Sequence, residues 1–170
     1  VPSSEEFVLG NIAALKRDLF DDTGFFFDSY AMDMGWSDPQ SVWQIDAKRF
    51  PDGFSKIREA LAAVHARPGL WVSPSSLYPP ALDNNWLQSA GYEVTPHKVL
   101  GLNACLTVGG KYQSAFKEAV LKHAESANLA HVKFDGFVPQ CEVESHGHHP
   151  GPESWLPIAE GLMDVFDALR

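Results

Sequence analysis

The amino-acid sequence predicts an α/β protein that forms a partial TIM (β/α)8 barrel, with about four strand–helix units and parallel strands. Short apolar runs alternate with amphipathic segments along the chain, a pattern typical of parallel strands joined by helical crossovers. Polar residues follow the apolar runs, as they do at the rim of a barrel. The 170 residues are predicted to form a single domain, 1–170, whereas a complete barrel needs about 250 residues.

The first half of the chain carries two helix patterns and two strand patterns. The predicted elements are a helix over 3–22, a strand over 24–28, a helix over 53–67 and a strand over 70–74. Ser3 and Glu6 have the spacing of a capping box at the start of the first helix. Pro68 and Gly69 end the second helix pattern.

The second half repeats this alternation after a long irregular stretch. Residues 75–100 are rich in Pro, Asn and aromatic residues and are predicted to be mostly loop, with a helical turn near Trp86. The elements predicted after them are a strand over 102–108, a helix over 111–127, a strand over 130–137 and a helix over 153–170. A half-barrel leaves strand edges open. We therefore expect a segment of a longer barrel, or a homo-oligomer that covers the edges; the first is favoured.

Composition and charge exclude several classes of function. Hydrophobic residues make up 45% and charged residues 21% of the chain, as in ordinary globular proteins. The formal net charge of -9 leaves no basic stripe for a phosphate backbone, so no nucleic acid partner is expected. No apolar run approaches the ~20 residues that span a bilayer, and residues 1–10 lack the features of a signal peptide. We expect a soluble protein without a membrane partner; its cellular compartment is not predicted.

Acidic and aromatic residues follow the predicted strands and are expected to meet at one rim, because parallel strands end on the same side of a sheet. These residues are Asp28, Asp33, Trp36, Lys133 and Asp135. Lys133 and Asp135 share a face of the last strand because alternate side chains point the same way. Carboxylates accept hydrogen bonds from hydroxyl groups, and an indole can cover the C–H face of a sugar ring. The rim suits a neutral polyhydroxylated ligand; the simpler alternative is that Asp28 and Asp135 only cap turns or helices.

Three stretches resemble the α-galactosidase clan of retaining glycoside hydrolases. They are "FFFDSYAMDMGW" (25–36), "IDAKRFPDGFSKIREALAAVHARPGLWVSP" (45–74) and "HVKFDGF" (131–137). The family pattern is a strand with Asp-Asp-Gly-Trp, then FP-G, a helix, a Gly-Leu strand ending in an aromatic residue, and finally Lys-aromatic-Asp. The most specific pieces are "RFPDGF…GLWVSP" and "VKFDG", in family order and at compatible spacing. The resemblance covers roughly 24–170 and implies a segment of a glycoside hydrolase catalytic barrel.

The resemblance also implies roles for individual residues. Asp135 matches the catalytic nucleophile, which would form a covalent glycosyl–enzyme intermediate. Lys133 matches a lysine that binds sugar hydroxyls and would keep the neighbouring carboxylate ionised. Asp33 and Trp36 match a segment that binds hydroxyls and walls the sugar pocket, and Trp71 matches an aromatic position on another strand. The implied activity is cleavage of a terminal α-linked sugar with retention, on an oligosaccharide or glycoside, without a cofactor.

The sequence departs from the family pattern at two points. The doubled aspartate is reduced to Asp33, while Asp28 lies five residues earlier, so which of the two binds the sugar stays open, as does the preference for galactose. A retaining enzyme also needs a second carboxyl about 5–5.5 Å from the nucleophile, and in the clan it comes from a later strand. No residue after Asp135 matches that motif. The resemblance therefore implies a nucleophile without its acid/base in this segment.

The segment "CEVESHGHHPG" (141–151) raises the question of a metal. Its histidines, Cys141 and a glutamate suffice for zinc by composition, but their spacing matches no zinc signature, and no bound metal is expected. A loop over the barrel mouth is favoured, as in related enzymes, with His146 in the pocket. Cys105 and Cys141 are expected to be free buried thiols; a disulfide between them is the alternative, and some clan members carry one in this neighbourhood.

Two other functions stay open. A non-catalytic carbohydrate-binding or structural half-barrel would hold a sugar at the same rim without cleaving it. A metal-dependent hydrolase that uses the histidines of 141–151 is less favoured.

Overall fold

The computed structural model describes residues 3–78, 81–99 and 101–170. The helices are α1 (Glu5–Leu15), the π-helix η1 (Lys16–Phe20), α2 (Asp21–Thr23), α3 (Ser55–Ala62), α4 (Asn84–Ser89), α5 (Lys111–Ser126), the 3-10 helices η2 (Glu144–His146) and η3 (Pro152–Ser154), and α6 (Trp155–Ala168). The strands are β1 (Ser29–Met32), β2 (Arg67–Val72), β3 (Val94–His97), β4 (Gly101–Ala104) and β5 (His131–Phe134). None of the helices within these ranges is long and apolar enough to cross a membrane.

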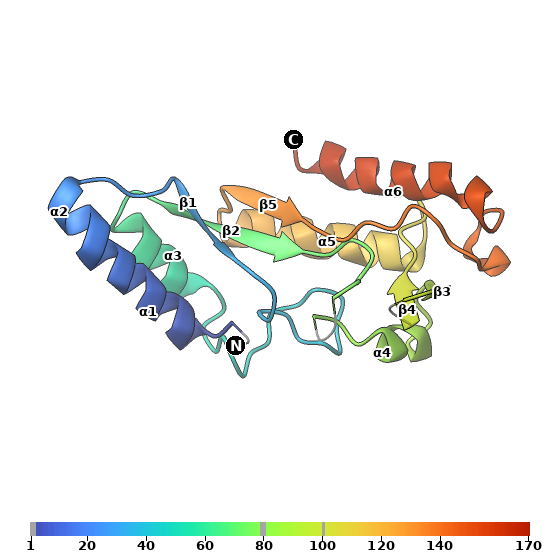
Figure 1. The fold of residues 1–170 in the computed structure, drawn as a ribbon, viewed down its shortest axis with the longest axis horizontal. Coiled ribbons are helices and arrows are strands. Elements are labelled where there is room, and N and C mark those ends of the chain that lie inside the picture. Colours follow the sequence, from blue (N-terminus) through green and yellow to red (C-terminus); the bar gives the residue numbers. More distant parts are fainter. Residues whose placement is uncertain (1–2, 79–80, 100) are drawn as a thin grey trace.

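A parallel sheet of three strands, in the order β1-β2-β5, forms the middle of the molecule. Figure 1 shows these strands running toward the end that carries β3, β4 and α4, while α1, α2 and α3 gather at the other end. Helix α3 connects β1 to β2, and α5 precedes β5. The predicted α/β class and a parallel sheet are therefore confirmed, whereas the place of this sheet in a partial barrel stays a prediction.

The predicted third parallel strand, 102–108, is wrong. Residues 101–104 form β4, which pairs antiparallel with β3, so that Val94 lies opposite Ala104 and His97 opposite Gly101. The partner strand β3 lies within 75–100, which the sequence predicts to be mostly loop. Because strand pairing depends on a partner elsewhere in the chain, apolar content alone could not distinguish a hairpin from a sheet strand.

The first strand begins later than predicted. The run 24–28 lies before β1, and Phe25 and Phe27 in it are 56% and 50% exposed. Pairing with β2 sets the position of β1, because Ser29 lies opposite Arg67 and Met32 opposite Leu70. An apolar run therefore indicated a nearby strand but not its register.

The helices begin close to their predicted positions. Ser4, rather than Ser3, is the N-cap of α1, and its hydroxyl accepts a hydrogen bond from the backbone N–H of Phe7, so the predicted capping box is wrong. Helices α5 and α6 contact β5 through Phe134, whose ring lies 6.4 Å from that of Phe116 and 4.9 Å from that of Phe166. In Figure 1 α5 lies behind β5 and α6 runs along the upper edge of the molecule.

The two faces of the sheet have different environments. Met32, Leu70 and Val72 are buried on the face that packs into the core. On the opposite face Ala31 and His131 are exposed, because successive side chains of a strand alternate between faces. The face that carries Ala31 and His131 is therefore partly open, although Trp71 on the same face is buried.

Candidate functional site

The register of the sheet brings predicted site residues of three strands onto one face. Trp71 on β2 lies opposite Lys133 on β5, and Asp135 follows two residues later on the same face. Ala31 on β1 lies opposite Gly69 on β2. Asp33 and Trp71 each follow two residues later, so they lie next to each other on the same face. Asp33, Trp71, Lys133 and Asp135 thus converge at the C-terminal ends of the strands.

Both carboxylate oxygens of Asp135 accept hydrogen bonds. Nε1 of Trp71 donates to Oδ2 at 3.1 Å, and the hydroxyl of Tyr78 donates to Oδ1 at 3.1 Å. The bond from Trp71, followed by the bond from Tyr78 and the positive charge of Lys133, holds the pKa of Asp135 below its ordinary value, although partial burial opposes this. The hydrogen bond between Tyr78 and Asp135 also raises the pKa of Tyr78. Asp135 is therefore an anion at neutral pH, held by two aromatic side chains.

The glycine after Asp135 lets two loops approach each other closely. Gly136 has a φ of 76°, and an added Cβ would lie 2.7 Å from Cε2 of Tyr78 and 2.8 Å from Oγ of Ser73. The backbone N–H of Ser75 donates to the carbonyl oxygen of Gly136 at 3.1 Å, and the Ser73 hydroxyl donates to it at 3.3 Å. The loop after β2 is therefore fastened to the loop after β5 beside the carboxylate.

Lys133 and Asp33 form an ion pair across the open face. Nζ of Lys133 lies 3.4 Å from Oδ2 of Asp33, and the two side chains are 49% and 70% exposed. A pair this exposed contributes about 0–1 kcal/mol to stability. Its significance is positional, since a cation and a second carboxylate stay accessible next to Asp135.

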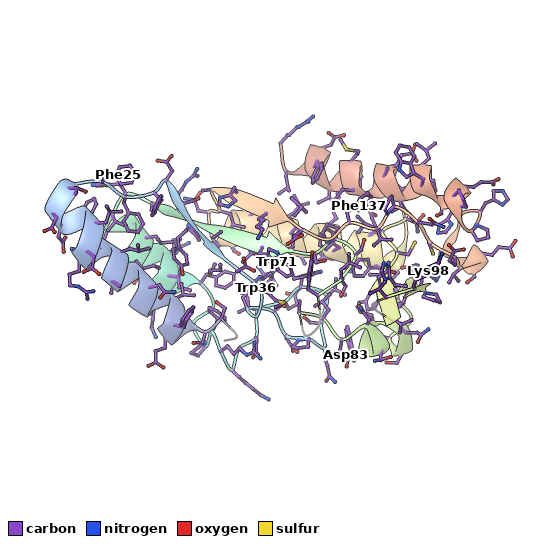
Figure 2. All side chains as sticks on the ribbon, in the orientation of Figure 1. Phe25, Trp36, Trp71, Asp83, Lys98 and Phe137 are labelled. Atoms are coloured by element: carbon purple, nitrogen blue, oxygen red, sulfur yellow. The ribbon has the colours of Figure 1, made fainter. Side chains whose placement is uncertain are left out.

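The two predicted tryptophans differ in their access to this face. Trp36 is 0% exposed, and its Nε1 donates to the carbonyl oxygen of Trp71 at 2.8 Å; Figure 2 labels both. The Trp36 ring packs against Trp43 and His123. Trp36 is thus a core residue that supports β2, and in this arrangement it cannot wall a sugar pocket. Trp71 is also buried, but its indole N–H reaches Asp135.

Asp28 lies at the opposite end of the sheet from Asp135. It precedes β1, and its carbonyl oxygen accepts a hydrogen bond from the N–H of Arg67, the first residue of β2. The predicted rim position of Asp28 is therefore wrong, because β1 begins after this residue and not before it. Of the two candidate aspartates, the structure brings only Asp33 to the C-terminal edge.

His146 lies with two cysteines and a second histidine. The ligand atoms of Cys105, Cys141, His146 and His148 all lie within 4.8 Å of one another. Both cysteines are free and buried, as predicted, and a hydrogen bond between them raises the pKa of Cys105 and lowers that of Cys141. His146 is predicted to lie in a sugar pocket, but in the structure its Nδ1 lies 3.2 Å from Sγ of Cys141.

Two features of the site could not be predicted from the sequence. Tyr78 lies in the stretch treated as loop, and no pattern there indicates that its hydroxyl reaches Asp135. Cys105 is separated from Cys141 by the whole of α5 and β5, so only the fold brings it next to the histidines. The histidine-rich composition of 141–151 was the available signal for this second group.

No protein-family model matches the chain, and no curated protein matches it. Solved structures do. The GH36 α-galactosidase AgaA of Geobacillus stearothermophilus, solved with raffinose, aligns with a TM-score of 0.70 and 16% identity over 98% of this chain and 24% of that one. The same enzyme has also been solved with stachyose.

Two further structures support the same relationship. An α-galactosidase from Lactobacillus brevis aligns with a TM-score of 0.65 and 17% identity, over 97% of this chain and 22% of that one. A cycloalternan-degrading enzyme from Trueperella pyogenes, solved with a covalent intermediate, aligns with a TM-score of 0.61 and 17% identity, over 99% and 28%. The sequence resemblance to the α-galactosidase clan is thus confirmed for the fold, and the chain has the fold of about a quarter of a GH36 α-galactosidase.

Proposed function

We propose that the chain is the part of a retaining α-glycosidase that carries the nucleophile, and that its substrate is an oligosaccharide or glycoside with a terminal α-linked sugar. The observation that carries the proposal is the ionised Asp135, which lies at the C-terminal end of a parallel strand with Lys133 on the same face. The C-terminal side of parallel strands is where α/β enzymes hold their substrates. Oligosaccharides bound to structural neighbours support a carbohydrate partner.

In the proposed reaction, a carboxylate oxygen of Asp135 attacks the anomeric carbon. A glycosyl ester forms while the bond to the leaving oxygen breaks, and a carboxylic acid protonates that oxygen. Water then hydrolyses the ester, and the same acid, now ionised, removes a proton from the water. Lys133 and Asp33 would bind sugar hydroxyls through their ammonium and carboxylate groups, because both side chains are accessible.

The acid/base is proposed to come from outside these 170 residues. The chain spans about a quarter of the enzymes that it matches, and no motif after Asp135 supplies the carboxyl. Barrel strands beyond this segment would provide it and cover the open sheet face.

A second candidate is a carbohydrate-binding half-barrel without catalysis. The observation that favours it is that Trp71 and Tyr78 already occupy one lone pair on each oxygen of Asp135. Hydrogen bonds that stabilise the anion lower its basicity and hence its nucleophilicity. The same donors would hold Asp135 as a fixed acceptor for sugar hydroxyls.

An α-galactosyl fluoride that carries a second fluorine on the sugar ring tests the proposal. Fluoride departs without protonation, so the reagent needs a nucleophile but no acid. We expect the 170-residue chain to gain the mass of one fluorosugar, with the ester at Asp135 in a peptide map. Asp135→Asn should abolish this labelling.

Asp28→Asn is the matched control, because Asp28 precedes β1 at the far end of the sheet and should leave labelling unchanged. Binding of α-galactosides without labelling would favour the binding module. Labelling elsewhere, or neither labelling nor binding, would contradict both candidates.

A further inference from the structure

The loop that follows β5 folds back onto the β3–β4 hairpin and places four metal-binding side chains together. Cys105 directly follows β4, Cys141 lies within the loop, and His146 and His148 lie farther along it. Sγ of Cys105 is 3.4 Å from Nε2 of His148, and Sγ of Cys141 is 3.2 Å from Nδ1 of His146. Around a tetrahedral zinc with ordinary bond lengths, neighbouring ligand atoms are about 3.3–3.8 Å apart. Two of the separations are therefore close to those of a zinc site, and the four ligand atoms all lie within 4.8 Å of one another.

The hydrogen bonds around His148 orient its metal-binding nitrogen. Nδ1 of His148 lies 2.8 Å from the carbonyl oxygen of His149. A carbonyl oxygen only accepts, so Nδ1 carries the proton and the Nε2 lone pair points to Cys105. An imidazole that donates from one nitrogen to a carbonyl and binds with the other is the usual arrangement at zinc.

The loop backbone is closed independently of the four side chains. Cys141 and Gly151 form an antiparallel bridge, in which the N–H of Gly151 donates to the carbonyl oxygen of Cys141 at 2.8 Å. The buried Ser154 accepts from the N–H of Cys141 at 2.8 Å and donates to the carbonyl oxygen of Gly151 at 2.6 Å. Gly147, with a φ of 79°, turns the chain between the two histidines. The fold thus presents Cys141, His146 and His148 from one closed loop toward Cys105.

We propose that Cys105, Cys141, His146 and His148 bind one structural zinc ion. Two thiolates and two imidazoles favour zinc over magnesium or calcium, which take oxygen ligands. Four protein ligands leave no open coordination position, so the site stabilises the fold and does not activate water. Two thiolates neutralise the charge of Zn²⁺, which suits a site whose sulfurs are buried. The proposal replaces the sequence-based expectation of no metal and of a sugar-binding His146.

The zinc would connect the β3–β4 hairpin to the loop that follows β5. Cys105 directly follows strand β4 of the hairpin. The other three ligands lie in the loop after β5, the strand that leads to Asp135. Between these parts the N–H of Glu142 donates to the hydroxyl of Thr95 at 3.0 Å. Metal binding that requires both segments in place stabilises the folded state. The inference does not depend on glycosidase activity.

Zinc titration of the reduced 170-residue chain, produced without a polyhistidine tag, tests the proposal. We expect one zinc per chain by elemental analysis. Each of Cys105→Ser, Cys141→Ser, His146→Asn and His148→Asn should lower the zinc affinity at least tenfold. His149→Asn is the matched control, because this exposed neighbour contributes only its backbone carbonyl, which the substitution preserves.

Cobalt binding provides a readout that loss of folding alone would not imitate. Tetrahedral Co²⁺ should give visible absorption bands together with thiolate-to-cobalt charge transfer, and these should keep their intensity in His149→Asn. A chelator should lower the melting temperature of the wild-type chain, and zinc should restore it. Less than one zinc per chain would overturn the proposal, and so would a zinc affinity in His146→Asn and His148→Asn equal to that of the wild type. A Cys105–Cys141 disulfide that persists in the zinc-treated reduced protein would also overturn it.

Discussion

At the scale of single residues, the protonation of Asp135 depends on donors from two segments of the chain. Trp71 belongs to β2, and Tyr78 to the loop that follows it, so neither is adjacent to Asp135 in sequence. Lys133 adds a positive charge from the strand itself. A nucleophile has to be ionised at the working pH, and this arrangement secures that before any sugar binds.

Replacing the donors should raise the pKa of Asp135. Trp71→Phe removes the hydrogen bond that contributes most to the lowering, so its pKa should rise toward the ordinary value, and Tyr78→Phe should give a smaller rise. Carbon-13 NMR titration of the side-chain carboxyl would measure both. Lys122→Met, on α5, is the control, since its contacts are elsewhere. An unchanged pKa in Trp71→Phe would show that the indole does not stabilise the anion.

His123 should make the free energy of unfolding depend on pH. Its ring is buried, its Nε2–H donates to the carbonyl oxygen of Trp43 at 2.7 Å, and burial lowers its pKa from 6.5. The unfolded state then binds a proton below pH 6.5 while the folded state does not, so stability is lost as the pH falls from 6.5 toward the lowered value. The slope for one proton approaches ~1.4 kcal/mol per pH unit.

His123→Gln keeps a donor for Trp43 but cannot titrate. Urea unfolding between pH 7 and pH 5, with a chelator present throughout, should give a shallower slope for this variant than for the wild type. Other titrating groups contribute equally to both proteins, so the difference isolates His123. Parallel slopes would show that the pKa of this ring is the same in the folded and unfolded states, and hence that burial does not lower it.

At the scale of elements, α6 packs directly on the backbone that leads from β4 to α5. An added Cβ at Gly161 would lie 1.9 Å from the carbonyl oxygen of Leu106, and the N–H of Val108 donates to the carbonyl oxygen of Pro157 at 2.9 Å. Only a glycine allows a helix to approach backbone this closely.

Gly161→Ala should therefore destabilise the protein, although alanine is the better helix former. We expect a loss of about 1–3 kcal/mol, the usual range for overpacking. Gly10→Ala on α1 is the matched control, because no atom lies within 4 Å of its added Cβ and the change should stabilise by about 0.5–1 kcal/mol. Urea denaturation of both variants would measure these differences. Equal effects of the two changes would contradict the packing argument.

Elements with strong local signals were predictable, and those set by distant pairing were not. The pattern over 111–127 predicted α5 within one residue, because helical periodicity lies in the local sequence. The run 102–108 is just as apolar, yet it gives β4 and then a connection, because its partner β3 is a segment without a comparable pattern. Pairing with β2 likewise places the first strand at Ser29–Met32, and not at 24–28 as the apolar run predicted.

The residues of the candidate site were likewise predictable where local strand alternation places them, and not where loops or distant pairing do. Alternation along one strand placed Lys133 and Asp135 on a common face, and the parallel sheet added Asp33. The predicted rim position of Asp28 was wrong because it depended on where β1 begins. Tyr78 and the pairing of Cys105 with His148 come from loops and from a hairpin that no periodicity describes.

At the scale of the whole molecule, the sheet has open edges. β1 and β5 each pair only with β2 among the described residues, and the face that carries Asp33 and Lys133 is accessible. In a closed barrel every strand has two neighbours. Unpaired strand edges attract other strands, so the remainder of a barrel or a second copy of the chain is the expected partner.

The isolated 170-residue chain should accordingly self-associate as its concentration rises, which sedimentation velocity would measure. Ala31→Lys places a charge on the edge strand β1, on the exposed face, and should weaken association several-fold because edge lysines oppose strand pairing. Ala62→Lys, on the exposed surface of α3, changes the net charge equally and should have a smaller effect. A chain that stays monomeric at all concentrations, or equal effects of the two lysines, would show that the open sheet is not the surface through which copies meet.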